Sequence, residues 1–446
     1  MNIAQKFRDL RTREYKVYYK SFFYIAMACF ILVFLILGKM TGGASFKSVF
    51  FKDRGDSFMD HYNSVIYNAV DPYENYVMYP PLATITYKLF LTIIPENVYN
   101  YVVSDPTKTA QPQQLKYYQG FVFQFIIFSM IMITAFLITV FLCKKGRARE
   151  KLMFAAVSFL STPFLFMLER GNNIIISLIF SLLFVSFYDS EKKVLRELAL
   201  IFLAIAVAYK LYPIALGVLL FRNKQYKELF RAGVYCVIFT VLPFFIFYDG
   251  INSIKLMLGS ISRVGGRTAT AANINGQLNF NQLFYYITGV LRISLPGADT
   301  LATLCRFALT GACVFCAFFI KDNWKSAMMC AAIIYGFQGT CSTYLLIFFL
   351  IPVMMLLDSE KKNNLLTYVY LFLMIMSIAP IVMPDPNTVG WSRYMPTKIS
   401  SLAVLGMVGL ACLETLVYII PKIRKLFADR KAAKACKKAL PQGGAA

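Results

Sequence analysis

Histidine and charged residues are both scarce in this sequence. One histidine occurs among 446 residues, and only 15% of the residues are charged. A water-soluble globular protein covers its surface with about 25% charged residues, so that class is excluded. No Cys-x-x-Cys pair lies beside the histidine in the sequence, which argues against a structural zinc site.

Long apolar runs take the place of the missing charge. Apolar residues make up 58% of the chain, and several runs approach the ~20 residues that cross a ~30 Å hydrocarbon layer. The runs are continuous rather than alternating, and backbone polar groups must be paired in lipid, so helices are expected. The sequence predicts an all-α, polytopic transmembrane helical bundle. Four of its runs are Phe22–Leu37, Phe121–Leu142, Leu365–Met383 and Ser401–Ile420.

The formal net charge of +23 follows membrane topology rather than nucleic-acid binding. Lys and Arg form short clusters between the apolar runs, and such clusters stay in the cytoplasm. Placing them there gives about twelve crossings with both termini cytoplasmic. We therefore expect one membrane domain, residues 1–420, and a basic cytoplasmic tail, residues 421–446, that contacts anionic lipid head groups. No nucleic-acid partner is expected.

Two segments depart from simple crossings. The stretch Leu82–Ile94 lies in the long outer loop 40–118, and a crossing there would place the next basic cluster outside. We expect it to be re-entrant or to lie on the membrane surface. The run 198–221 is interrupted at Lys210, which is followed closely by a proline. Two short crossings that meet at Lys210 on the outer side fit this pattern.

The outer loop is rich in carboxylates for so apolar a chain. Asp56 and Asp60 are four residues apart, so on a helix they share one face. Like charges at this spacing repel, which favours one base with a perturbed pKa or a cation shared by both. The alternative is a solvated loop whose carboxylates have no catalytic or cation-binding role.

Two cations are expected among apolar segments on the outer side. Arg170 lies in a turn between apolar helices, and Lys210 lies at the break described above. Ionisable residues near membrane depth are costly and mark functional sites. A lipid phosphate or pyrophosphate is a fitting partner, because guanidinium groups hold phosphate oxygens bidentately. The alternative is an internal ion pair with Glu169 or Asp56.

Amide and aromatic side chains supply further candidates. Asn279 and Gln282 lie in an outer loop that also contains Arg267, and amides both donate to and accept from sugar hydroxyls. Arg393 stands beside Trp391, a pair equally typical of an interfacial anchor.

An ordered set of short strings resembles glycosyltransferase family 87. These enzymes are polyprenyl-phosphate-mannose-dependent mannosyltransferases with the GT-C fold. The resemblance covers roughly residues 20–300, and no motif in the last third of the chain contributes to it. The matching strings are Asp56-Ser-Phe-Met-Asp60, Asp71-Pro-Tyr73, Tyr79-Pro-Pro-Leu82, Arg170-Gly-Asn-Asn173, Ala208-Tyr-Lys-Leu-Tyr-Pro213 and Asn279-Phe-Asn-Gln282.

The resemblance implies inverting transfer of a sugar, with mannose as the family default, to an acceptor hydroxyl on the outer face of the cell membrane. It implies Asp56 as the general base, with Asp60 as the second choice. Arg170 and Lys210 would stabilise the charge on the leaving phosphate. The expected substrate-binding residues are Tyr79, Asn173, Arg170, Lys210, Arg267, Asn279, Gln282 and Arg393.

The expected partners are a polyprenyl-phosphate sugar donor, an acceptor that is a glycolipid, glycan or protein, and membrane lipids. No nucleotide-binding motif occurs, which agrees with a lipid-borne donor. No cofactor and no resident metal are expected, although the paired carboxylates could bind a divalent ion weakly.

Two other classes remain open. A transporter or flippase of lipid-linked sugars would show internal repeats and polar residues at mid-membrane depth. A cell-surface polysaccharide polymerase or ligase would share the topology but use basic residues in place of a loop carboxylate.

Overall fold

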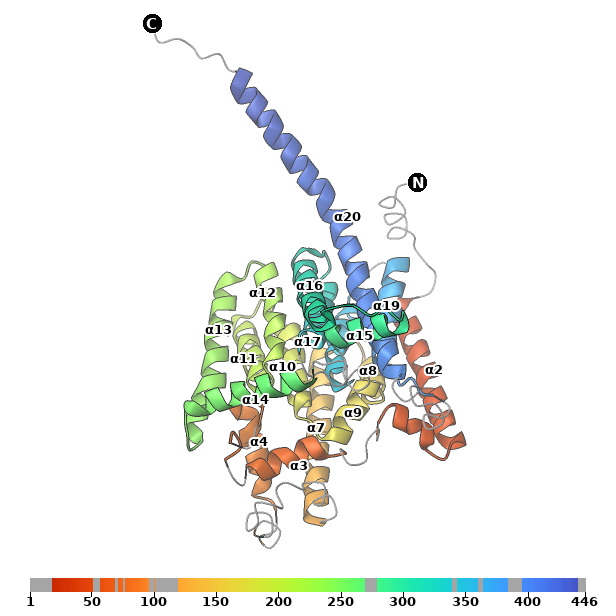
Figure 1. Ribbon diagram of the computed structural model, residues 1–446, viewed down its shortest axis with the longest axis vertical. Coiled ribbons are helices and arrows are strands. Elements are labelled where there is room, and N and C mark those ends of the chain that lie inside the picture. Colours follow the sequence, from red (N-terminus) through yellow and green to blue (C-terminus); the bar gives the residue numbers. More distant parts are fainter. Residues whose placement is uncertain are drawn as a thin grey trace.

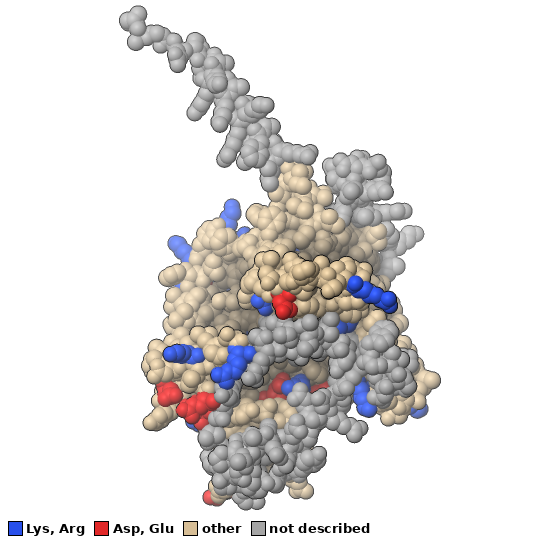
Figure 2. Space-filling view, viewed as in Figure 1, with Lys and Arg blue, Asp and Glu red and all other residues tan. Residues whose placement is uncertain are grey.

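The computed structural model of the chain is mostly helical in its described residues, and none of these forms a strand. The all-α prediction is therefore confirmed for this part of the chain. The helices form one bundle, and the C-terminal part of the long helix α20 (Met395–Ala439) extends away from it at one end (Figure 1). Most of the surface that Figure 2 draws for the described residues is uncharged. The structure describes residues 18–50, 57–68, 71–74, 77–94, 96, 100, 119–268, 279–338, 343–359, 364–383 and 395–439.

Five of the described helices are long and apolar enough to cross a membrane, and a sixth span results if two helices bent by 62° count as one. Three predicted runs are confirmed as such helices, because they lie within α2, α7 and α20. The bent pair is α8 (Ala148–Phe159) and α9 (Thr162–Arg170). The five are α2 (Tyr19–Met40), α7 (Gln119–Cys143), α13 (Tyr226–Val241) continued by η4 (Leu242–Ile246), α16 (Ala298–Phe319) and the part of α20 up to Pro421.

The run Leu365–Met383 is only partly helical. Its helix, α19, covers Leu365–Ile378 and is one of several shorter apolar helices. Ala379 is extended, with ψ at 148°, because the proline that follows disfavours helical backbone in the residue before it. The prediction of about twelve crossings and cytoplasmic termini stays a prediction.

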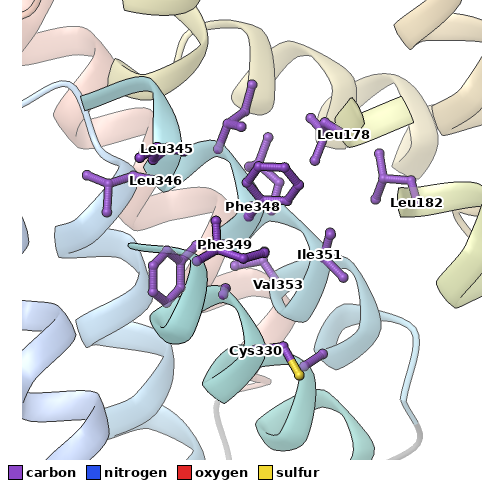
Figure 3. Packing of buried hydrophobic residues seen from close by; sticks show 14 of the residues in the cluster. Leu178, Leu182, Cys330, Leu345, Leu346, Phe348, Phe349, Ile351 and Val353 are labelled. Atoms are coloured by element: carbon purple, nitrogen blue, oxygen red, sulfur yellow. The ribbon is translucent and has the colours of Figure 1, made fainter. Parts of the chain in front are cut away.

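The centre of the bundle is built from such short helices. Figure 3 shows side chains of α10 (Ile174–Phe187) across from those of η6 (Thr343–Phe349) and α18 (Leu350–Leu357). Leu178 and Phe348 in this cluster are fully buried. A helix buried on most sides needs no polar face, which explains why α10 is apolar except for three serines.

The interruption at Lys210 is present. Helix α11 (Lys193–Tyr209) ends there, Lys210 adopts extended backbone with φ −150° and ψ 123°, and the chain continues into η3 (Tyr212–Gly217) and α12 (Val218–Arg222). Pro213 occupies the first turn of η3, where its missing N–H leaves no helical bond unmade.

The segment that the sequence predicts as the outer loop forms short helices at the end of the bundle opposite the extension of α20 (Figure 1). Helix α4 (Pro81–Leu91) has 11 residues, about 16 Å at 1.5 Å per residue, too short to cross a ~30 Å layer. Helix α3 (Met59–Tyr67) packs beside it. Helix α14 (Asn252–Thr268) covers a small apolar cluster there through Met257, which packs with Tyr73 and Phe244.

Candidate functional site

The chain enters α3 by docking onto the end of α9. The backbone N–H of Phe58 donates to the Glu169 carbonyl at 2.8 Å, and the Ser57 hydroxyl donates to the Glu169 carboxylate at 2.8 Å. Phe58 has a left-handed backbone, with φ 66°, which is uncommon for a residue with a side chain. The two bonds hold this turn and fix the first residues of α3 against α9.

Asp60 then meets the turn that links α9 to α10. Arg170 Nη2 lies 2.5 Å from Asp60 Oδ1, and Asn172 Nδ2 donates to Asp60 Oδ2 at 2.7 Å. The Arg170 and Asp60 side chains are only 15% and 13% exposed. Both carboxylate oxygens are therefore engaged by donors within a shielded site.

The sequence of the turn explains its shape. Gly171 ends α9 in a left-handed conformation with φ 64°, and the Asn172 N–H bonds back to the Met167 carbonyl at 3.2 Å. This is the usual helix stop with glycine. Asn172 Oδ1 accepts the Ile174 N–H at 3.0 Å, so its Nδ2 is directed to Asp60.

Lys210 and Tyr79 complete the cluster. The Lys210 ammonium lies 3.7 Å from the centre of the Tyr79 ring, and Asn172 Nδ2 lies 3.5 Å from the Tyr79 hydroxyl. Lys210 is buried, and among the described residues it makes no ion pair closer than 4 Å. Four segments distant in sequence thus converge here: the start of α3, residues 77–80, the α9–α10 turn and the break after α11.

Electrostatics divides the roles of these groups. Burial alone would raise the pKa of the Asp60 carboxyl, but the Arg170 charge and the hydrogen bonds from Arg170 and Asn172 outweigh burial and lower it. Asp60 is thus ionised and a weak proton acceptor. Burial lowers the pKa of Lys210 to about 7, against the opposing effect of Asp60. Lys210 therefore changes charge near neutral pH, unless an added anion stabilises the ammonium.

Asn173 presents a buried amide beside this cluster. Its backbone N–H donates to the Tyr87 hydroxyl at 3.1 Å, and that hydroxyl donates to the Gly171 carbonyl at 3.2 Å. The Asn173 side chain is fully buried, and neither of its polar atoms has a partner within the described part of the chain. An unmade hydrogen bond at a buried amide costs about 1–3 kcal/mol, so this side chain is suited to a polar ligand.

The single histidine lies directly behind Asp60. His61 is fully buried among aromatic rings, and its Nε2 lies 3.2 Å from Gln124 Oε1. Burial lowers the pKa of His61 to about 4, partly offset by the Gln124 bond. Gln124 donates its own N–H to the Phe90 carbonyl, so the neutral imidazole is assigned as donor from Nε2. His61 therefore fixes α3 against α7 rather than carrying charge.

The comparison with known families bears on this geometry directly. The family model of glycosyltransferase family 87 matches residues 77–338, more than half of the chain. The chain belongs to glycosyltransferase family 87. The match includes Tyr79, Arg170 and Lys210 but begins after Asp56 and Asp60. No curated protein and no solved structure matched the chain.

Membership of family 87 confirms two expectations. The protein is an enzyme, a glycosyltransferase, and with its five helices of spanning length it is a membrane glycosyltransferase. The transporter alternative is thereby set aside. Within the described residues, no group of three or more His, Cys, Asp or Glu side chains could hold a metal ion.

The structure brings together five of the predicted site residues of this family 87 enzyme: Asp60, Tyr79, Arg170, Asn173 and Lys210. Of the two partners weighed for Arg170, Asp56 lies outside the described residues and Glu169 accepts from Ser57, whereas Asp60 holds the guanidinium.

The other candidates are placed elsewhere or not at all. Asn279 caps α15 (Phe280–Val290), where its side chain accepts the Gln282 N–H at 2.8 Å. Arg267 belongs to α14, but its side chain lies outside the described residues, as does the whole of Arg393.

Sequence reasoning missed Asn172 and Tyr87. Asn172 stood inside the string Arg170-Gly-Asn-Asn173 and was passed over for Asn173. Tyr87 gave no signal, because it reads as one more aromatic residue in an apolar helix.

Proposed function

We propose that this family 87 enzyme transfers mannose from a polyprenyl-phosphate donor to an acceptor hydroxyl on the outer face of the cell membrane, with inversion at the sugar. The observation that carries the proposal is the meeting of Arg170 and Lys210 at one shielded site. Asp60 makes an ion pair with Arg170, whereas Lys210 makes no ion pair among the described residues. The site can therefore accept an anion.

A phosphate group fits this site better than a neutral sugar alone. The Lys210 ammonium rests on the Tyr79 ring with no carboxylate of the described residues in contact, so a phosphate oxygen can approach it and raise its depressed pKa. The Arg170 guanidinium at the same site adds a second positive charge that attracts the phosphate. Together they would stabilise the negative charge that develops as the phosphate leaves.

The engagement of Asp60 favours Asp56 as the base. Both Asp60 oxygens accept strong hydrogen bonds, and a carboxylate with a lowered pKa is a poor proton acceptor. In the proposed step Asp56 takes the proton of the acceptor hydroxyl, and the acceptor oxygen bonds to the anomeric carbon. The bond from that carbon to the phosphate oxygen breaks on the opposite face, and the phosphate keeps the electron pair.

The surroundings of the site support a donor that is a lipid. The converging segments belong to a helical bundle with five helices of spanning length, and the sequence contains no nucleotide-binding motif. A donor held in the membrane by its polyprenyl chain reaches such a site without crossing water. Mannose and the outward orientation are implied by the family resemblance and by the positions of the basic clusters.

The experiment is transfer of labelled mannose from polyprenyl-phosphate-mannose, in membranes that contain wild type, Asp56→Asn, Asp60→Asn or the control Glu74→Gln. Glu74 is an exposed carboxylate of the same loop. We expect turnover by wild type and Glu74→Gln, and a loss of about 10²–10⁴-fold in Asp56→Asn. Full activity in Asp56→Asn with loss in Asp60→Asn would reassign the base. If the wild type transfers no mannose from polyprenyl-phosphate-mannose but does transfer a sugar from a pool of other lipid-phosphate sugars, mannose is refuted as the donor sugar.

A further inference from the structure

Arg306 is a cation inside a helix of membrane-spanning length, far along the chain from Lys210. Arg306 is eight residues from the start of α16 and thirteen from its end, about 12 Å and 20 Å along the axis. Helix α16 is one of the five helices of spanning length. An arginine at such depth costs several kcal/mol unless an anion or water compensates it.

Arg306 has no such compensation from the described protein. It makes no hydrogen bond or ion pair there, its Nε is buried without a partner, and its one contact of note is with the adjacent Phe307 ring at 5.2 Å. The nearest acid on α16, Asp299, lies about two turns away and accepts a hydrogen bond from Tyr285. The guanidinium is thus left with open donors.

The position of Arg306 on α16 places it toward the bundle. Ala302 and Cys313, one turn before and two turns after, are fully buried, and residues at these spacings share a helix face. Thr310, one turn after Arg306, also has a buried hydroxyl without a partner among the described residues. The buried Arg306 Nε and the buried Thr310 hydroxyl oxygen therefore lie one turn apart on this side of α16.

This pair lies where a neighbouring helix stops. The Phe307 ring packs against Phe337 at 6.2 Å, and Phe337 is the residue at which α17 (Asn323–Gly336) ends. Other faces of α16 present apolar side chains to the surroundings, since Leu304 and Phe307 are more than half exposed. A ligand of Arg306 can accordingly arrive from the lipid, past the end of α17.

We propose that Arg306 and Thr310 form a binding site for the phosphate group of a membrane lipid. Phosphate is the anionic group of membrane lipids, and the flexible Arg306 side chain can extend toward the lipid phosphates at the nearer end of α16. The planar guanidinium binds two phosphate oxygens at once. The threonine hydroxyl can donate to a third oxygen. The site is separate from the Arg170–Lys210 cluster, which lies on α9 and after α11.

Two lipids carry this chemistry, a bilayer phospholipid and a polyprenyl phosphate. If the occupant is a polyprenyl phosphate, Arg306 is a waiting position for donor or spent carrier, an interpretation that rests on the proposed function. If it is a phospholipid, the site anchors α16 in the membrane. Binding of the phosphate itself does not depend on sugar transfer.

The test uses full-length protein in phosphatidylcholine nanodiscs that contain a small fraction of phosphatidylglycerol or of sugar-free polyprenyl phosphate. Lipids retained per protein are counted by native mass spectrometry for wild type, Arg306→Gln, Arg306→Lys and the control Arg292→Gln, an exposed arginine. The polyprenyl phosphate arm is repeated in a Lys210→Gln background, so that the Arg170–Lys210 cluster does not mask the result.

We expect Arg306→Gln to weaken retention of one lipid phosphate about tenfold, Arg306→Lys to restore part of it, and Arg292→Gln to match wild type. If the wild type retains polyprenyl phosphate more strongly than phosphatidylglycerol, the site is a substrate position. If it retains the two lipids equally, the site is a general lipid-phosphate site. Equal retention by wild type and Arg306→Gln for both lipids overturns the proposal, with unfolding temperatures confirming that the variants are folded. Because no sugar is transferred, this result is independent of the mannosyltransferase assay.

Discussion

The Lys210 ammonium and the Tyr79 ring are in direct contact, with the nitrogen 3.7 Å from the ring centre. The lysine is available because α11 stops at Tyr209, and the tyrosine is held just before α4 begins. A desolvated cation over an aromatic face is stabilised by about 2 kcal/mol or more, but burial still lowers the pKa of Lys210 to about 7. Lys210 is therefore sensitive to pH and to a bound anion.

The pH dependence of donor use follows from this contact. The folded pKa of Lys210 is lowered, so its charge is present below about pH 7 and lost above it. We expect kcat/KM for the donor to fall as pH rises through about 7, because this ratio reports groups of the free enzyme. At saturating donor the phosphate raises the pKa, so the fall in kcat should come at higher pH. In Lys210→Arg the fall in kcat/KM near pH 7 should vanish. If this fall remains in Lys210→Arg, Lys210 is not the group that causes it.

Tyr79 should act through its ring rather than its hydroxyl. The hydroxyl has only a long 3.5 Å contact with Asn172, whereas the ring supports the ammonium. We expect Tyr79→Phe to keep activity within about threefold, and Tyr79→Leu to lose about five- to thirtyfold in kcat/KM, from a lost interaction of ~1–2 kcal/mol. Tyr79→Leu should also move the fall in kcat/KM that we assign to Lys210 to lower pH, because the ammonium is less stabilised. Steady-state kinetics across pH would contradict this view if Tyr79→Phe were the more damaging change.

Asp60 and Arg170 should behave as one unit. Replacing Asp60 by Asn leaves the guanidinium without its carboxylate, so Asp60→Asn, Arg170→Gln and the double variant should be strongly non-additive in stability and in kcat/KM, with a coupling of about 1–3 kcal/mol. Because the folded pKa of Asp60 is lowered, the stabilisation is present above its unfolded pKa of about 4. It is lost only as the pH falls through the lower folded value. Additive effects at pH 7 would show that the pair is not coupled.

The sequence was sufficient for the class of protein and for the cations of the site. Arg170 and Lys210 stood out because charge among apolar segments is costly, and the break at Lys210 followed from Pro213. Which acid meets Arg170 could not be predicted from spacing. That choice depends on how the turn at Phe58 docks α3 onto Glu169, a contact between segments more than a hundred residues apart.

The number of crossings and the role of Arg306 could not be predicted from the sequence for similar reasons. Helices α10 and α19 are apolar but have 14 residues each, and a short apolar run alone does not distinguish a crossing from a buried core helix. Arg306 was absorbed into an apolar run, because its lack of a partner appears only when the neighbouring helices are in place.

Gly171 should be the most sensitive glycine near the site. It has φ +64°, and a Cβ there would lie 2.6 Å from His61 Cβ and 2.8 Å from Phe125 Cε2. We expect Gly171→Ala to destabilise the protein by about 2–4 kcal/mol, from left-handed backbone and overpacking together. The matched control is Gly233→Ala in α13, where a Cβ meets nothing within 4 Å, and there we expect a gain of about 0.5–1 kcal/mol.

Gly171→Ala should also lower transfer in the protein that remains folded. His61 adjoins Asp60 in sequence, and Gly171 adjoins both Arg170 and Asn172, so pushing the two backbones apart separates the carboxylate from its donors. A misplacement of about 1 Å can cost 10²-fold in rate. Thermal unfolding in detergent gives the stability, and the transfer rate is compared below both unfolding transitions. A Gly171→Ala protein with wild-type turnover would mean that the spacing of Asp60 and the α9–α10 turn does not limit the reaction.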